Sequence, residues 1–361
     1  ADAGAVLGSA LAIKMLAYVG VAPVAQAFAD QFPRRSLLVA LDLVRAVVAI
    51  CLPFVTEVWQ IYLLIFVLQA ASAGFTPTFQ ATIPDILPDE EDYTKALSLS
   101  RLAYDLESLI SPMLAAALLT VISFHNLFAG TVLGFLVSAA LVVSVRLPTT
   151  IPGPRRGIWD RTTRGTRIYL ATPRLRGLLA ISLAVSAAGA MVIVNTVVLV
   201  KARFGLGEVE VASALAAFGG GSMVAAFVLP SLLEKVADRT AMLTGATVLV
   251  VGTGIGALLP SYALLLPLWL IIGFGYSVAQ TPSGRLLRRS AHAEDRPAIF
   301  AAHFALSHAC WLICYPLAGR FGAVMGLPST FIVMSLIGLA GVALTLWLWP
   351  ASDPSDVAHD H

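Results

Sequence analysis

The chain has 361 residues, of which 58% are hydrophobic and only 12% are charged, and its formal net charge is +2. Its mean hydropathy of +0.86 excludes an ordinary soluble domain, which carries about twice that share of charged residues. The charge lies mainly in the segments between hydrophobic stretches. It therefore reports on membrane topology and gives no indication of nucleic-acid binding.

Eleven hydrophobic segments follow one another along the chain, and each is about long enough to cross a ~30 Å hydrocarbon core. Lipid satisfies no backbone polar group, and membrane-spanning strands are shorter and alternate in polarity, so the segments are predicted to be α-helices. They cover residues 4–28, 36–56, 58–83, 96–121, 125–146, 175–200, 209–233, 240–259, 261–283, 298–325 and 328–349. The predicted fold class is all-α, a polytopic protein embedded in the lipid bilayer.

Lys and Arg are concentrated in alternate connections between these segments. The longest connection, 148–173, contains five arginines, Arg155, Arg156, Arg161, Arg164 and Arg167, and the positive-inside rule predicts that it is cytoplasmic. The C-terminus is then cytoplasmic too, in a multi-pass protein of the plasma (inner) membrane. Between Trp159 and Leu170 the arginines alternate with apolar residues, so this stretch could lie on the anionic inner leaflet as an interfacial helix.

Polar landmarks recur in the same order at an offset of about 205 residues, which indicates an internal repeat. In each half a Pro-containing turn is expected to close a span, an acidic cluster follows, and a proline is expected to interrupt the next span. These landmarks are 76–78, 88–92 and Pro112 in the first half, and 281–283, 293–296 and Pro316 in the second. They predict two six-helix bundles in parallel repeat, 1–147 and 174–350, joined by the linker 148–173 and followed by a polar tail, 351–361.

The segment 26–35 resembles the signature loop between the second and third helices of major facilitator superfamily transporters, with matches at Asp30, Arg34 and Arg35. The span from residue 96 resembles the family's antiporter signature in degraded form, with Pro112 retained and Glu107 in place of a glycine. The resemblance covers essentially the whole chain except the family's first helix. Because the chain begins with Ala1 directly before its first span, we expect that helix to be missing.

The resemblance implies a secondary active transporter that exports a small solute or ion by alternating access. It further implies proton antiport, a monomer, no cofactor and no enzymatic activity. Segments 280–289 and 304–311 resemble nickel/cobalt-resistance exporters within the superfamily. Nickel or cobalt is therefore the first expectation for the substrate, and a multidrug or siderophore-type exporter is the alternative. A membrane receptor that does not transport and an intramembrane enzyme are further alternatives.

Ionisable residues inside spans are costly and are therefore candidates for energy coupling. Phe66 stands where the family has its coupling arginine, so a carboxylate is expected to couple instead. Asp105 and Glu107 are two residues apart and cannot face one cavity. One of them could couple while the other pairs with Arg101, or the ion pair could be purely structural. Two further candidates lie one helical turn apart in the span 36–56 and could instead extend the charge network of the preceding loop: Asp42 and Arg45.

Two more sets of residues are candidates for gating and for substrate binding. The resemblance assigns inner-gate roles to residues of two repeat-related loops: Asp30, Arg34, Arg35, Asp238 and Arg239. His and Cys side chains on the span 298–325 could contact a transition metal, and polar residues of neighbouring spans could line a cavity. These are His303, His308, Cys310, Cys314, Asn195, Tyr276 and Gln280. Packing and hydrogen bonding between helices would explain the same residues.

Overall fold

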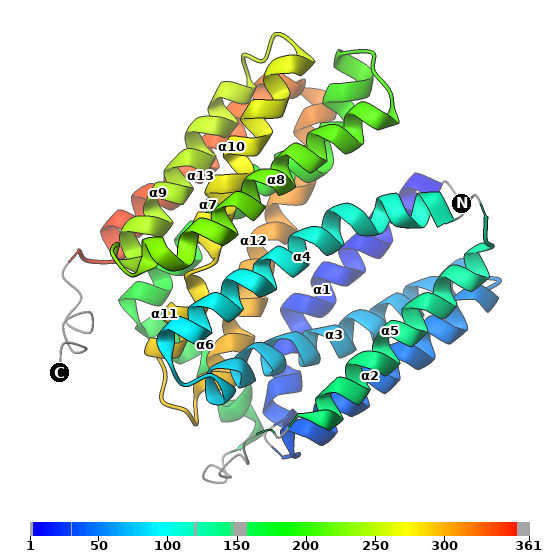
Figure 1. Ribbon diagram of the computed structural model, residues 1–361, viewed down its shortest axis with the longest axis vertical. Coiled ribbons are helices and arrows are strands. Elements are labelled where there is room, and N and C mark those ends of the chain that lie inside the picture. Colours follow the sequence, from blue (N-terminus) through cyan, green and yellow to red (C-terminus); the bar gives the residue numbers. More distant parts are fainter. Residues whose placement is uncertain (1–2, 30, 119–120, 146, 148–156, 352–361) are drawn as a thin grey trace. The chain divides into compact units, whose positions relative to one another are not determined.

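The computed structural model describes residues 3–29, 31–118, 121–145, 147 and 157–351, and these residues form helices and no strands (Figure 1). The eleven predicted spans all correspond to long helices. They are α1 (Ala3–Ala29), α2 (Arg34–Cys51), α3 (Val58–Ile86), α4 (Glu90–Leu118), α5 (Phe124–Ser144), α7 (Pro173–Val197), α8 (Glu208–Leu233), α9 (Asp238–Gly256), α10 (Tyr262–Gln280), α12 (Arg296–Val324) and α13 (Leu327–Leu348). Two shorter helices, α6 (Ile158–Ala171) and α11 (Ser283–Arg289), connect them. The all-α class is confirmed.

Within the described residues, nine helices are long and apolar enough to cross a membrane. The two predicted spans outside this group are α4 and α9. Both begin with charged residues, Glu90, Glu91 and Asp92 in α4 and Asp238 in α9, and α4 carries further ionisable side chains along its length. Charged residues lower the mean hydropathy of α4 and α9 although both helices are long. The two helices therefore differ from the other nine in composition and not in length.

The expectation that prolines close or interrupt spans is wrong in three of four places. Helix α3 continues through Pro77 and Pro84, and α4 and α12 continue through Pro112 and Pro316. A proline removes one backbone hydrogen bond, and a helix packed among other helices tolerates that loss. Only α10 behaves as predicted, because it ends at Gln280 before Pro282 and the chain resumes helix at Ser283.

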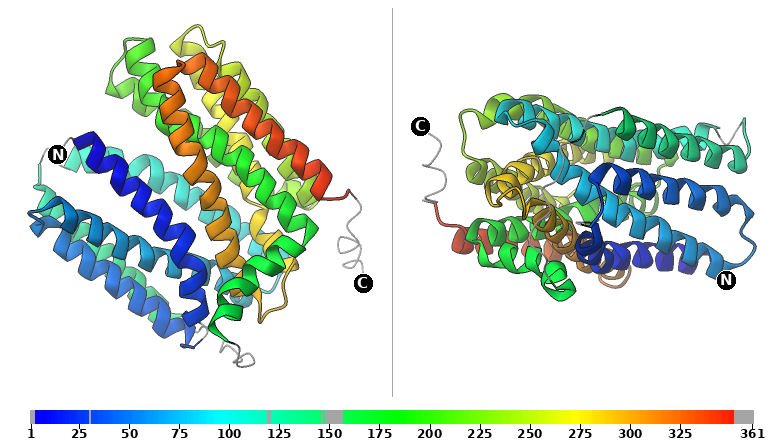
Figure 2. Two further views of the ribbon diagram at one scale, coloured as in Figure 1. Left: turned by 180° about the vertical axis from the view of Figure 1, so that it is seen from behind. Right: turned by 90° about the horizontal axis from the view of Figure 1, so that it is seen from below.

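The contacts divide the chain into two compact units, and each unit takes residues from both halves of the sequence. Unit 1 comprises Ala1–Pro88, Leu114–Tyr169 and Leu287–Leu312, and unit 2 comprises Asp89–Met113, Leu170–Leu286 and Ile313–His361. In unit 1, α1 packs on α3, and α2 packs on both α3 and α5. In unit 2, α10 packs on α8 and α9, and α13 packs on α7 and α9 (Figures 1 and 2). The division by chain order into bundles 1–147 and 174–350 stays a prediction.

Glycines allow the closest helix contact in unit 2, between α8 and α10. A Cβ added at Gly221 would lie 1.8 Å from the carbonyl oxygen of Leu270, and one added at Gly273 would lie 1.8 Å from that of Phe218. Only a residue without a side chain fits at either position. Small residues at such contacts are typical of helices in lipid, where tight van der Waals packing replaces the hydrophobic effect between helices.

Candidate transport site and gate

Asp85, in the last turn of α3, is the centre of a charge cluster in unit 1. Its two carboxylate oxygens accept hydrogen bonds from Arg34, at the start of α2, and from Arg296, at the start of α12. All three side chains are at most 18% exposed. Next to them, Arg35 donates to the backbone carbonyl of Val145 at 2.5 Å. We call Asp85, Arg34 and Arg296 the first charge cluster.

Arg285 of α11 is the centre of a similar cluster in unit 2. Its guanidinium lies 2.8 Å from a carboxylate oxygen of Glu90 and 3.3 Å from one of Asp238, and it also donates to the hydroxyl of Thr94 at 3.2 Å. Asp238 is almost fully buried at the start of α9. We call Arg285, Glu90 and Asp238 the second charge cluster. The neighbouring Arg239 does not join it and donates instead to the carbonyl of Trp349 at 3.0 Å.

The two clusters have opposite compositions. The first has two arginines around one carboxylate, and the second has two carboxylates around one arginine. Each cluster also joins helices from both sequence halves, and all the connections involved lie on the side predicted to be cytoplasmic.

The sequence interpretation singled out Arg34 and Asp238 but missed their partners. Four of the six cluster residues were not recognised individually: Asp85, Glu90, Arg285 and Arg296. Their pairing joins helices that are far apart in the sequence, and no spacing in the sequence indicated it. Asp30, which the family signature assigned to the same gate, lies outside the described residues.

Asp42 and Arg45, one helical turn apart on α2, form an ion pair inside unit 1. Asp42 is fully buried and also accepts a hydrogen bond from Ser138 of α5 at 2.8 Å. The guanidinium of Arg45 stacks on Phe75, 4.0 Å from the ring centre, and on Phe135, 4.8 Å away. The pair ties α2 to α3 and α5.

Arg101 of α4 is surrounded by aromatic and amide groups in unit 2. Its guanidinium carbon lies 4.6 Å from the ring centre of Tyr276 and 5.4 Å from that of Tyr104, and it donates to Gln280 at 3.2 Å. Tyr276 packs edge-on against Phe218 of α8, with 5.3 Å between ring centres. Two of these contacts, with Tyr276 and Gln280, join Arg101 to residues predicted to line a cavity. Glu107 is exposed on α4, and the side chain of Asp105 lies outside the described part of the chain.

The His and Cys stripe of α12 makes separate contacts rather than one common site. The Nδ1 atom of His303 lies 3.0 Å from the hydroxyl of Tyr169, and that of His308 lies 2.7 Å from the carbonyl of Phe304. Cys314 lies 3.3 Å from the hydroxyl of Ser186, and Cys310 is buried. No group of three or more His, Cys, Asp or Glu side chains suited to a metal occurs among the described residues.

Asn195 connects α7 to α12 by a hydrogen bond from its amide to the carbonyl of Ala318 at 3.2 Å. It is 2% exposed, and its amide also contacts the sulfur of Met191. This geometry is that of a polar link between helices.

Comparison with known proteins identifies the family of the chain. The family model described as Major Facilitator Superfamily matches residues 3–193 and again residues 179–360. The chain is also similar to a solved structure, the human organic anion transporter MFSD10 (TETRAN). The TM-score is 0.80 at 15% sequence identity, over 95% of this chain and 83% of that one, and at this identity the likeness concerns the fold alone.

Sequence relatives match a shorter part of the chain. Macrolide efflux protein A of Enterococcus faecalis is 28% identical over 152 residues, which is 39% of this chain and 47% of that protein. The protein of the same name from Streptococcus pyogenes is also 28% identical, over 37% of its length. An uncharacterised MFS-type transporter of Bacillus subtilis, YfiS, is 27% identical over 35% of this chain and 30% of its own. The matched region therefore spans less than half the length of each of these relatives.

Proposed function

Because the chain belongs to the Major Facilitator Superfamily, we propose that it is a monomeric, proton-coupled exporter of organic, drug-like compounds. It would work by alternating access between two bundles, 1–147 and 174–350, around a central binding site. Export from the cell across the plasma membrane fits the efflux relatives. The proposed gate and substrate class rest on contacts in the structure, and the proposed coupling rests on the sequence.

The charge clusters carry the argument for alternating access. Asp85 of the first half binds Arg296 of the second, and Arg285 of the second half binds Glu90 of the first. Bonds of this kind hold the predicted cytoplasmic ends of the bundles together and must break when the inside opens. The clusters are therefore the inner gate of the proposed transporter.

The surroundings of Arg101 support an organic substrate. Tyr276, Tyr104 and Gln280 offer flat ring surfaces and an amide around one guanidinium, and binding sites for organic molecules combine apolar walls with a few polar groups in this way. A nickel or cobalt exporter needs converging nitrogen, sulfur or oxygen ligands. The described His and Cys side chains instead contact Tyr169, Ser186 and a backbone carbonyl.

A carboxylate of α4 would carry the proton. Phe66 occupies the position of the family's coupling arginine, and Glu107 and Asp105 lie on the same helix as Arg101. A carboxylate that is protonated in one state and ionised in the other can exchange a proton for a substrate molecule across the membrane.

The test is transport by the full-length protein in proteoliposomes with an imposed pH gradient. Macrolides and fluorescent organic compounds are compared with nickel and cobalt, and Arg101→Ala is compared with Leu346→Ala, which alters an exposed side chain of α13. We expect pH-driven movement of organic compounds that Arg101→Ala abolishes and Leu346→Ala preserves. Movement of nickel or cobalt without any organic substrate would overturn the proposed substrate class, and no movement of any solute would overturn the transport function.

A further inference from the structure

Helix α6 is fixed to α12 by its inner face. Arg164 forms a bidentate pair with Asp295, just before α12, at 2.5 and 2.8 Å, and this hydrogen bonding raises the pKa of Arg164. A Cβ added at Gly165 would lie 2.0 Å from the carbonyl oxygen of Ala298, so the two backbones touch. Tyr169 is fully buried and contacts His303. Burial raises the pKa of Tyr169, so its phenol stays neutral. Because contacts in two successive turns hold α6, its orientation within unit 1 is determined.

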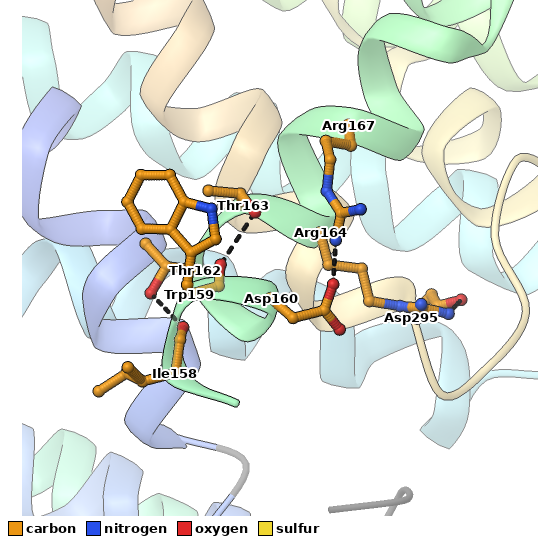
Figure 3. Close-up of polar contacts among 8 residues, drawn as sticks. All are labelled: Ile158, Trp159, Asp160, Thr162, Thr163, Arg164, Arg167 and Asp295. Atoms are coloured by element: carbon orange, nitrogen blue, oxygen red, sulfur yellow. Dashed lines mark hydrogen bonds and ion pairs between the residues drawn. The ribbon is translucent and has the colours of Figure 1, made fainter. Parts of the chain in front are cut away.

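On the opposite face of α6, no contact with the described residues buries Trp159 or Leu170. Trp159, Thr163, Arg167 and Leu170 follow the spacing i, i+4, i+8 and i+11, which places them on one face of the helix. Trp159 is 78% exposed and Leu170 is 44% exposed. Figure 3 shows Trp159 and Ile158 on the side of the helix away from Arg164 and Asp295, while Arg167 pairs with Asp160. An exposed indole beside arginines is the composition of helices that lie in a membrane interface.

The segment is positively charged. Between Ile158 and Arg176 there are five arginines and one acidic residue, Asp160. Arg164 is held by Asp295 on the inner face, and Arg167 is the arginine of the outer face. Helix α6 ends at Ala171 and the predicted membrane span α7 begins at Pro173, so α6 directly precedes a predicted membrane entry point in the chain. The exposed face from Trp159 to Leu170 extends about 16 Å along the helix axis at 1.5 Å per residue. The cytoplasmic leaflet beside α7 is the surface that can cover this face of α6 along its length.

We propose that the outer face of α6 is a docking surface for anionic phospholipids of the cytoplasmic leaflet. Trp159, Ile158 and Leu170 enter the headgroup region, and Arg167 contacts lipid phosphates. Each arginine at such a surface strengthens binding by about five-fold. The inner face holds Asp295, whose neighbour Arg296 belongs to the first charge cluster. Docking therefore acts on the segment that bears this cluster, whatever the protein transports.

The experiment follows the environment of position 159 in the full-length protein in nanodiscs. A Trp159→Cys variant, with Cys51, Cys310 and Cys314 replaced by serine, is labelled with the fluorophore NBD. A matched control carries the label at Lys235→Cys, an exposed position of the loop between α8 and α9. Emission and quenching by neutral acrylamide are compared in discs of phosphatidylcholine alone and of phosphatidylcholine with phosphatidylglycerol, and size-exclusion chromatography checks that each variant is folded.

With phosphatidylglycerol, we expect blue-shifted emission and loss of acrylamide quenching at position 159, with no change at position 235. Salt at 1 M, where the Debye length falls to about 3 Å, should reverse the effect, and Arg167→Gln should increase the amount of anionic lipid needed. Equal quenching in both kinds of disc would overturn the proposal. Protection that requires an added cytoplasmic protein instead of anionic lipid would overturn it too.

Discussion

Neutralising Asp85 should open the predicted inner gate. In Asp85→Asn the first charge cluster keeps two cations, Arg34 and Arg296, without the carboxylate between them. Exposed ion pairs contribute about 0–1 kcal/mol and breaking a buried pair costs about 3–5 kcal/mol. The side chain of Asp85 is 18% exposed, so its loss should cost the closed state about 2 kcal/mol. If the cluster is absent from the inward-open state, the ratio of open to closed molecules rises about 30-fold.

The assay is the rate at which a cysteine at buried Ser98 on α4 reacts with a membrane-impermeant maleimide from the cytoplasmic side. Glu91→Gln is the matched control, because it removes a carboxylate from an exposed pair with Lys95 near the same ends of the helices. We expect Asp85→Asn to accelerate labelling about 30-fold and Glu91→Gln to change it less than three-fold. Equal labelling rates in Asp85→Asn and the parent protein would refute the idea that the first charge cluster closes the inside.

Three further predictions concern the other charged groups. Arg285→Gln removes the centre of the second charge cluster and should accelerate labelling at Ser98 in the same direction; slower labelling would contradict the common role of the two clusters. Asp42→Asn should lower the free energy of unfolding by about 3 kcal/mol in thermal or denaturant unfolding in detergent, because it leaves Arg45 buried without its carboxylate; full stability would show that the pair is dispensable. Glu107→Gln should abolish pH-driven export and retain substrate exchange, and if Glu107→Gln and Asp105→Asn both keep full pH-driven export, a carboxylate elsewhere carries the proton.

Features set by local sequence were predictable from the residues. Span length and hydropathy located the eleven long helices, and the spacing of Asp42 and Arg45 put them one helical turn apart. Contacts between distant parts of the chain were not predictable in this way. Arg34 and Asp85 are 51 residues apart, and Arg296 and Asp85 are 211 apart, so no local pattern connects them.

The His and Cys stripe of α12 shows a second reason for incomplete prediction. Helical periodicity correctly puts His303 and Cys314 on one face, but the helix meets different neighbours along its length. His303 contacts Tyr169 of α6, whereas Cys314 contacts Ser186 of α7. Residues on the same face of a helix therefore need not belong to the same site. Which residues share a site depends on how the helix packs against its neighbours.

The opposite composition of the two charge clusters has an electrical consequence. The first cluster has one excess positive charge and the second has one excess negative charge, so together they are neutral. Moving one elementary charge across a membrane potential of 100 mV changes the free energy by about 2.3 kcal/mol. Equal movements of a cation excess and an anion excess cancel, and the opening of the inner gate is then electrically silent. The membrane voltage would act on the proton and on the charge of the transported molecule. The gate itself would open or close only in response to bound protons or substrate.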